Sequence, residues 1–155
     1  MTEDTSTDLE ALVTYRVLQL SDTITRAAAQ VYRDRHGISL TELRAMAIIA
    51  AHAPIAANEV SRRTGIDKGW ISRSLTTLAE NGLVTRSPHP TDSRSALLSL
   101  TDKGQALVGR LLPLATARHQ YILSDLTPEQ RDALYRLLDT MQVRADELLA
   151  NPEMF

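Results

Sequence analysis

Apolar residues recur at three- and four-residue steps along most of the chain, the spacing that places them on one face of a helix. The first stripe runs from Leu9 to Val31 and predicts a helix that ends near His36 and Gly37. Further helices are predicted over 39 to about 51, about 57–64, 67–81, 101 to about 124 with a bend at Pro113, and from Thr127 through Leu148.

Residues typical of helix N-termini stand at several of these boundaries. Ser39 and Glu42 have the spacing of a capping box, and Asp67 is a natural N-cap. Thr127 precedes a proline at the first helical position, and Gln130 is placed to reach back to the cap. These local signals fix the predicted boundaries more firmly than the periodicity alone.

The period of the pattern changes between the fourth and fifth predicted helices. Residues 83–87 and 95–100 are predicted strands, and the segment 88–94 between them is rich in proline and turn-forming residues. We therefore expect a β-hairpin with an extended tip.

The segment 59–75 has the pattern of a helix-turn-helix. Val60 and Ile71 are placed to pack its two helices together, Ser61 is small where they cross, and Gly65 supplies the turn. When its apolar residues point inward, the second helix presents basic and small polar residues of the kinds that reach base edges and phosphates. Two amphipathic helices with a solvated face are the alternative, which the hairpin that follows argues against.

The hairpin supplies a second candidate contact to DNA. Arg86 lies on its first strand, and Asp92 precedes Arg94 by two residues near its tip. Such an aspartate can hold the guanidinium ready for a narrow minor groove. A surface ion pair worth less than ~1 kcal/mol is the alternative that these residues leave open. The predicted DNA-contacting residues are Ser61, Lys68, Gly69, Ser72, Arg73, Thr76, Arg86, Asp92 and Arg94.

The first helix and the last two carry apolar stripes too long for the module between them to cover. Such helices usually bury their stripes against a second copy of the chain. The predicted fold class is mainly α with a small β-hairpin wing: a winged helix-turn-helix lobe on a helical dimerisation base, in the order α-α-α-α-β-β-α-α. The predicted parts are a flexible tail (1–8), a helical dimerisation region (9–36 and 101–150) and a DNA-binding lobe (39–100).

Composition narrows the class of protein. Apolar residues make up 43% of the chain, enough for a core, and cysteine is absent, which excludes disulfides and thiolate metal sites. No apolar run approaches the roughly 20 residues that cross a bilayer, and the polar, acidic first residues do not resemble a secretory signal. We expect a cytoplasmic protein without membrane attachment.

The net charge of −2 argues by itself against a nucleic-acid partner, but the charge is unevenly distributed. The segment 58–100 contains six basic and four acidic residues, so it is net positive while the rest of the chain is net negative. A local basic face can bind phosphate in such a protein.

Enzymatic chemistry has no support in the sequence. There is no G-x-S-x-G, P-loop or G-x-G-x-x-G motif, and the four histidines are scattered without ligand spacing. We expect no catalytic activity, no metal and no cofactor.

Several motifs together give the chain a resemblance to the MarR family of bacterial regulators. The segment 92–104 matches the family's wing signature, in which Asp-x-Arg is followed by a strand and Leu-Thr-x-x-Gly. Ile71-Ser-Arg73, Leu40-Thr-Glu42 and the Leu-Thr-Pro-Glu-Gln run 126–130 match as well. The chain is similar to the family from about residue 9 to 149.

The resemblance implies a single domain (1–155) that forms a homodimer and binds double-stranded DNA. It implies that Lys68, Ser72 and Arg73 contact the major groove, while Asp92 positions Arg94 in the minor groove. Trp70 stands where the family usually has a smaller residue. Either it packs inward or it alters the groove contacts, and we expect partial burial.

The resemblance also implies a small-molecule effector, since members bind aromatic acids, phenols or acyl-CoA thioesters. Tyr15 and Arg16 interrupt an aliphatic stripe and could meet such a ligand, although they are expected more readily to face solvent or the partner subunit. The candidate ligand-binding residues are Tyr15, Arg16, Leu20, Met46 and Ile49.

The function predicted from all of this is a repressor that a ligand releases from a pseudo-palindromic operator. A winged module used for protein assembly is the competing hypothesis. It would predict an apolar or acidic second helix, whereas Lys68, Arg73 and Arg94 favour DNA.

Overall fold

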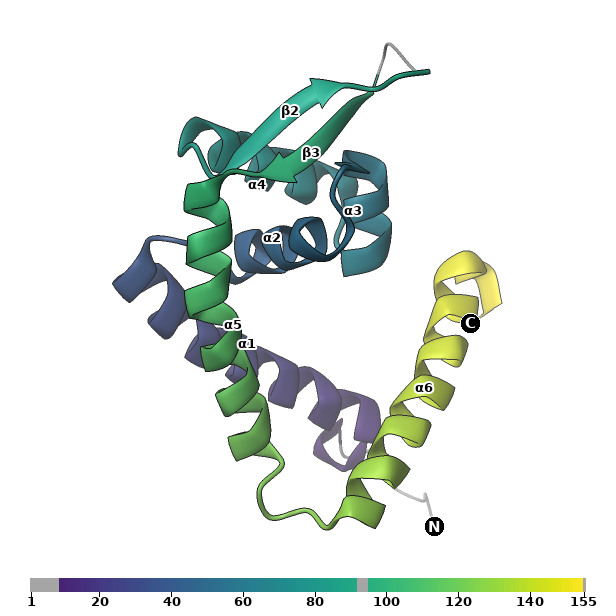
Figure 1. The fold of residues 1–155 in the computed structure, drawn as a ribbon. Helices are drawn as coiled ribbons and strands as arrows, with labels where there is room; N and C mark the ends of the chain where they lie inside the picture. The colour runs from purple at the N-terminus through teal and green to yellow at the C-terminus, as the bar shows by residue number, and fades with distance from the viewer. Residues whose placement is uncertain (1–8, 92–94, 155) are drawn as a thin grey trace, which may run out of the picture. The chain divides into compact units, whose positions relative to one another are not determined.

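The computed structural model describes residues 9–91 and 95–154, and Figure 1 shows the order of its elements. In the described part of the chain, no helix combines the length and the apolar character that a membrane span needs. The elements are η1 (Leu9–Ala11), α1 (Val13–His36), α2 (Leu40–His52), β1 (Ile55–Ala56), α3 (Ala57–Thr64), α4 (Lys68–Glu80), β2 (Val84–Pro88), β3 (Ala96–Leu100), α5 (Asp102–Ile122), α6 (Pro128–Ala150) and η2 (Pro152–Met154).

The predicted helix starts are confirmed by their hydrogen bonds. Ser39 and Glu42 form a capping box at α2, and Thr127 and Gln130 form one at α6. The carboxylate of Asp67 accepts the amide N–H groups of residues 69 and 70 at the start of α4. The predicted first helix is wrong at its start, because a 3₁₀ turn precedes α1, which begins at Val13.

The predicted hairpin is confirmed and gains a third strand. β2 and β3 pair antiparallel with Val84 opposite Leu100, and β1 pairs with the other edge of β3. Sequence analysis did not predict β1, which has two residues, too few for a periodic pattern. Its pairing of Ile55 with Leu98 brings two buried side chains together.

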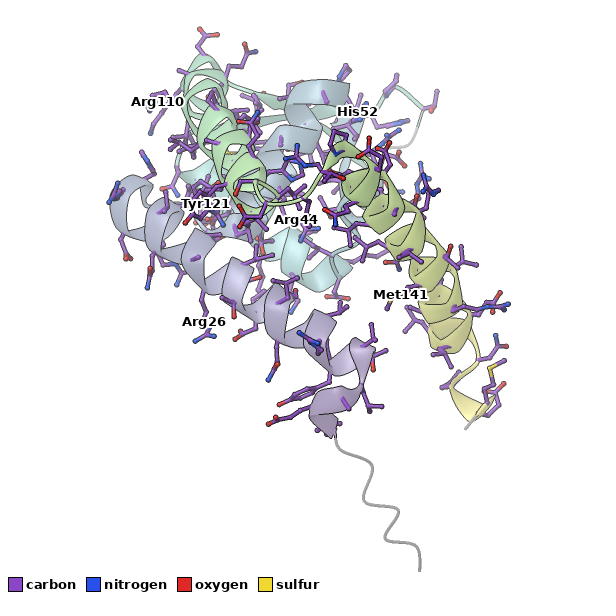
Figure 2. The ribbon with its side chains drawn as sticks, turned by 90° about the horizontal axis from the view of Figure 1, so that it is seen from below. Arg26, Arg44, His52, Arg110, Tyr121 and Met141 are labelled. Carbon is purple, nitrogen blue, oxygen red and sulfur yellow. The ribbon has the colours of Figure 1, made fainter. Side chains whose placement is uncertain are left out.

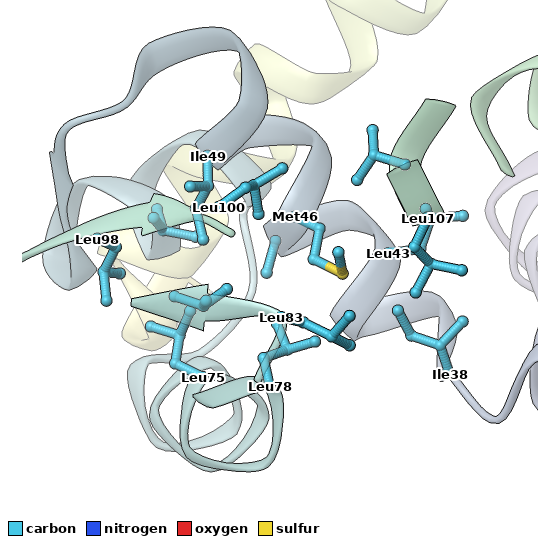
Figure 3. Packing of buried hydrophobic residues seen from close by; sticks show 14 of the residues in the cluster. Ile38, Leu43, Met46, Ile49, Leu75, Leu78, Leu83, Leu98, Leu100 and Leu107 are labelled. Carbon is cyan, nitrogen blue, oxygen red and sulfur yellow. The ribbon is translucent and has the colours of Figure 1, made fainter. Parts of the chain in front are cut away.

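The chain divides into two compact units, residues 1–112 and 113–155, with the boundary inside α5. In the first unit, α2, α3 and α4 pack on one another and on the sheet, and their apolar side chains form one core. Figure 3 shows this cluster between the helices and the hairpin. Its members include Ile38, Leu43, Met46, Ile49, Leu75, Leu78, Leu83, Leu98, Leu100 and Leu107.

The turn before β2 is joined to the start of α5 by a set of short contacts. The hydroxyl of Thr101 donates to the carbonyl of Gly82 at 2.8 Å and accepts the amide N–H of Gly104 at 3.0 Å. The backbone N–H of Thr101 donates to the carbonyl of Leu83 at 3.1 Å. A Cβ at position 104 would overlap that Leu83 carbonyl, so the approach requires glycine. This joint, formed by residues 82, 83, 101 and 104, explains the Leu-Thr-x-x-Gly motif.

The apolar stripe of α1 is covered at one end only. Ala28 and Tyr32, toward its C-terminus, are buried in the core of the first unit. Toward its N-terminus, Val13, Val17 and Leu20 are 62%, 38% and 56% exposed in the single chain. On the outer side of α1, Arg26 pairs with Asp22 in the exposed i,i+4 arrangement (Figure 2).

The second unit contains the end of α5 and all of α6. Its two helices are linked where the hydroxyl of Tyr135 lies 3.2 Å from Nε2 of His119. No residue of α6 is buried in the single chain, although Leu137, Leu138, Val143 and Leu149 are all apolar. This unit therefore leaves most of its apolar surface uncovered.

The joint at residue 104 predicts opposite effects for two glycine substitutions in one helix. Gly104→Ala forces the Leu83 backbone aside and is expected to lower the free energy of unfolding by about 1–3 kcal/mol. Gly109→Ala meets nothing within 4 Å and is expected to raise it by up to about 1 kcal/mol, because alanine favours helix. Urea denaturation of both variants measures the difference, and equal effects would contradict the close approach.

Candidate DNA interface

The two helices of the predicted helix-turn-helix are α3 and α4, and they pack as the sequence indicated. Val60 and Ile71 are 0% and 1% exposed at their contact. Gly65 takes a left-handed conformation with φ of 66° at the end of α3, which makes the turn possible. Arg44 of α2 (Figure 2) donates to the carbonyl of Thr64 at 2.8 Å and so satisfies the last turn of α3.

Ser61 lies inside this packing and away from the exposed surface. It is 8% exposed, and its hydroxyl donates to the carbonyl of Ile66 at 2.7 Å. The prediction that Ser61 contacts DNA is corrected on this ground: a side chain buried at the helix crossing, with its hydroxyl committed to the turn, has no surface to offer a duplex. Its role is to hold the turn.

The inward side of α4 fixes which residues point outward. Ile71, Leu75 and Leu78 are each 1% exposed, which confirms that they face the core. The exposed residues opposite form what we call the outward face of α4: Lys68, Gly69, Ser72, Arg73 and Thr76. All five are on one helix whose N-terminus carries the positive end of the macrodipole, which favours phosphate.

Trp70 is 61% exposed, so the expected partial burial was wrong. The core beneath the first turn of α4 is filled by Ile71, the next residue, and Trp70 is turned about 100° away from it. The guanidinium carbon of Arg73 lies 4.5 Å from the centroid of the indole ring. This pair was not predicted, although residues three apart on a helix are neighbours on its surface.

Arg86 of β2 connects the hairpin with the outward face of α4. Its Nη2 donates to the hydroxyl of Thr76 at 3.4 Å. Arg86 and Ser72 also line a pocket of about 420 Å³ with Asn58 and Ser95, between α3, α4 and the strands. The basic strand residue is therefore placed beside the polar helix face.

Asp92 and Arg94 lie outside the described residues. The hairpin on either side of them is described: the amide N–H of His89 donates to the carbonyl of Ser95 at 3.3 Å, beyond the last paired strand residues. This hydrogen bond lies next to the ends of the paired strands, at Pro88 and Ala96.

Two arginines of α3 are paired with a carboxylate on the same helix. Glu59 accepts hydrogen bonds from both Arg62 and Arg63 at 2.6–2.8 Å. The hydrogen bond from Arg62, followed by that from Arg63 and the charges of both, lowers the pKa of the Glu59 carboxyl. Glu59 therefore offsets one of the two positive charges of α3 and holds both arginines in ion pairs within the helix.

The five predicted ligand-binding residues differ in their exposure to solvent. Arg16 and Leu20 are exposed on α1, and Tyr15 is half-buried there, whereas Met46 and Ile49 are wholly buried in the core. Of these, Ile49 lines a pocket of about 460 Å³ in the first unit, together with Pro54, Leu100, Gln105, Val108 and Gly109. Met46 is corrected to a core residue, since packing on every side leaves it no ligand surface.

The helix pair α3 and α4, with the hairpin of β2 and β3 directly after it, is the architecture of a winged helix-turn-helix protein. The sequence profile described as the MarR family matches residues 36–95. The HTH-type transcriptional regulator YkoM of Bacillus subtilis is 27% identical over 114 residues, 74% of each chain.

Solved structures agree with the sequence comparison. A mutant MarR from E. coli complexed with operator DNA is 25% identical, with a TM-score of 0.75, over 86% of this chain and 96% of that one. The PcaV regulator from Streptomyces coelicolor, in complex with its natural ligand, has the same fold at 20% identity, with a TM-score of 0.77 over 89% and 96% of the two chains. The chain is therefore similar in sequence to the MarR family of DNA-binding transcriptional regulators over residues 36–95, and it has the winged helix-turn-helix fold of these solved regulators. Its relatives are regulators, not enzymes.

The burial of Ser61 predicts that two serine substitutions have different effects, one on stability and the other on DNA affinity. Ser61→Ala is expected to lower the free energy of unfolding by about 0.5–1.5 kcal/mol, because the Ile66 carbonyl loses its donor, and to leave the DNA affinity of the folded protein unchanged. Ser72→Ala, on the exposed face, is expected to lower DNA affinity and leave stability unchanged. Urea denaturation and fluorescence anisotropy with labelled DNA measure the two quantities. A loss of affinity in folded Ser61→Ala would restore that residue to the interface.

Proposed function

We propose that this protein is a homodimeric repressor that binds a pseudo-palindromic operator and leaves it when a small aromatic or acyl ligand binds. The observation that carries the proposal is the outward face of α4, whose basic and hydroxyl groups are exposed together beside Arg86. These groups match the donors and acceptors of base edges in a major groove. A dimer seated on a promoter blocks transcription by occupying it.

The residues divide into two kinds of contact. Lys68, Ser72 and Arg73 enter the major groove on the first turns of α4, where recognition helices make their base contacts. Arg94 reaches the minor groove from the hairpin tip, with Asp92 holding its guanidinium, and Arg86 supports the hairpin against α4. Base contacts then give sequence preference, and phosphate contacts give general affinity.

The second copy of the chain covers the exposed half of the α1 stripe. Val13, Val17 and Leu20 continue the line of Ala28 and Tyr32 along one helix, so an apolar surface begins in the core and ends in solvent. A C2 partner offers the same stripe in return. The apolar residues of α6, in the 101–150 part of the dimerisation region, are proposed to be covered in the same way.

The ligand acts on the spacing of the two α4 helices. Two half-sites are read when the helices lie about one DNA turn apart, ~34–36 Å. A ligand that prefers another spacing lowers DNA affinity by its differential binding free energy, typically ~1–3 kcal/mol. The pocket lined by Ile49 and Gln105 has the volume of a small-ligand site. PcaV, which has this fold, was solved with its natural ligand.

Two arginine substitutions test DNA reading directly. Arg73→Ala is expected to cost ~1–3 kcal/mol on the preferred duplex and little on random DNA, because it removes a base contact. Arg94→Ala is expected to weaken binding to both duplexes and to reduce the salt slope by about one phosphate contact. Anisotropy titrations at several salt concentrations, with a duplex from the region upstream of the protein's own gene, measure both. Equal losses on the two duplexes for Arg73→Ala would contradict base reading.

Two leucines of α1 test the dimer. Leu20→Arg places a charge in the stripe and is expected to shift the protein from dimer to monomer in light scattering, with loss of operator binding. Leu18→Arg is the matched control, since Leu18 is 68% exposed on the same helix but lies off the stripe. A dimer that survives Leu20→Arg, or one that both substitutions dissociate equally, would remove the α1 stripe from the interface.

Ligand release is tested on the DNA complex itself. Benzoate-type acids, phenols and acyl-CoA thioesters are titrated into the complex while anisotropy follows the DNA. One class is expected to lower operator affinity by about 5- to 150-fold, the range of typical coupling energies. Operator binding that no compound weakens would separate DNA recognition from the ligand proposal.

A further inference from the structure

We propose that Trp70 is a positioning residue that holds the Arg73 guanidinium in a fixed plane for reading a guanine in the major groove. The inference rests on the proposed function and names how one contact of that function is prepared. It assigns a role to a side chain that the predicted DNA-contacting set left out.

The geometry of the first turn of α4 carries the proposal. The guanidinium carbon of Arg73 lies 4.5 Å from the Trp70 ring centroid, within the distance at which a cation is attracted to an aromatic face. The tryptophan is three residues N-terminal to the arginine, so the arginine side chain runs back toward the helix start. Among the described residues, no carboxylate forms a salt bridge with Arg73, and its guanidinium lies over the indole ring.

Gly69 leaves the space that this arrangement needs. A Cβ built at position 69 would lie 3.6 Å from Nη1 of Arg73 and 3.0 Å from Oδ1 of Asp67. A side chain at position 69 would therefore begin in contact with the guanidinium and press on the Asp67 carboxylate. Asp67 is already committed to the amide N–H groups of Gly69 and Trp70, so it caps the helix while the arginine passes beside it.

Stacking against the ring has a specific consequence for hydrogen bonding. The guanidinium carbon lies over the indole ring. A guanidinium stacked on a ring keeps its N–H donors available, because they lie in its own plane. A planar fork held in place matches O6 and N7 of guanine, and restraint in the free protein reduces the entropy lost on binding. Trp70 therefore raises affinity through Arg73, and only where Arg73 has a guanine to read.

The pair is tested first in the free protein, without DNA. Trp70 is the single tryptophan of the chain, so its emission reports on this turn alone. Arg73→Ala is expected to change the emission maximum or intensity, because the cation leaves the ring. Lys68→Ala removes a neighbouring cation of the same turn and is expected to leave the emission unchanged. Emission that is unaffected by Arg73→Ala would overturn the pairing, whatever the protein does with DNA.

The role in recognition is tested by a double-mutant cycle on a duplex that the wild-type protein selects from a random pool. Trp70→Leu is expected to weaken binding about two- to fivefold, the size of an exposed cation–π interaction, with no change of salt slope because the arginine keeps its charge. In the Arg73→Ala background the same substitution is expected to have no effect. Trp70→Phe, which keeps an aromatic face, is expected to recover part of the affinity.

The outcomes separate the proposal from the function on which it rests. Losses that add in the double variant would show that Trp70 contacts DNA by itself, and would overturn the positioning role. If Trp70→Leu lowers the thermal stability of the protein and Trp70→Phe recovers none of the DNA affinity, Trp70 acts in folding, and the positioning role is overturned. A wild-type protein that selects no sequence would defeat the proposed function, while the emission experiment still decides the pair.

Discussion

The burial of Ile71, Leu75 and Leu78 against α2 and the sheet is the constraint from which the interface follows. Three side chains on one side of α4 fix the rotation of the helix about its axis, and that rotation decides which residues meet solvent. If α4 were rotated by roughly a quarter of a turn about its own axis, Arg73 would no longer lie on the outward face. Apolar packing on one side of α4 thus decides which side chains are exposed on the other side. The residues at those exposed positions then need only be basic or polar.

A second constraint locks the hairpin to that helix. Thr101 and Gly104 hold the turn at Gly82 and Leu83, where α4 has just ended and β2 is about to begin. Arg86 makes the next connection, to Thr76. The helix and the hairpin are therefore joined at the base of the strands and again part of the way along β2, so the two elements proposed to contact DNA are held together.

The elements that local chemistry controls could be predicted, and those that depend on tertiary packing could not. Capping at Ser39, Asp67 and Thr127 involves residues a few positions apart, so its signal is complete in the sequence. The exposure of Trp70 depends on what fills the neighbouring space, which no window of sequence contains. Met46 was misassigned for the same reason: an apolar residue at helical spacing fits a core and a ligand site equally well. The sequence did place Ser61 at the helix crossing, and its burial there is what argues against a contact with DNA.

In the proposed dimer, the divided stripe of α1 would couple association with folding. Its C-terminal half is part of the core around Tyr32, and its N-terminal half is continuous with it on a single rigid helix. In the proposed dimer, a partner that covers Val17 and Leu20 stabilises the same helix that completes each subunit's own interior. By mass action, the melting temperature would then rise with protein concentration, and dilution in the cell would weaken the fold together with the assembly.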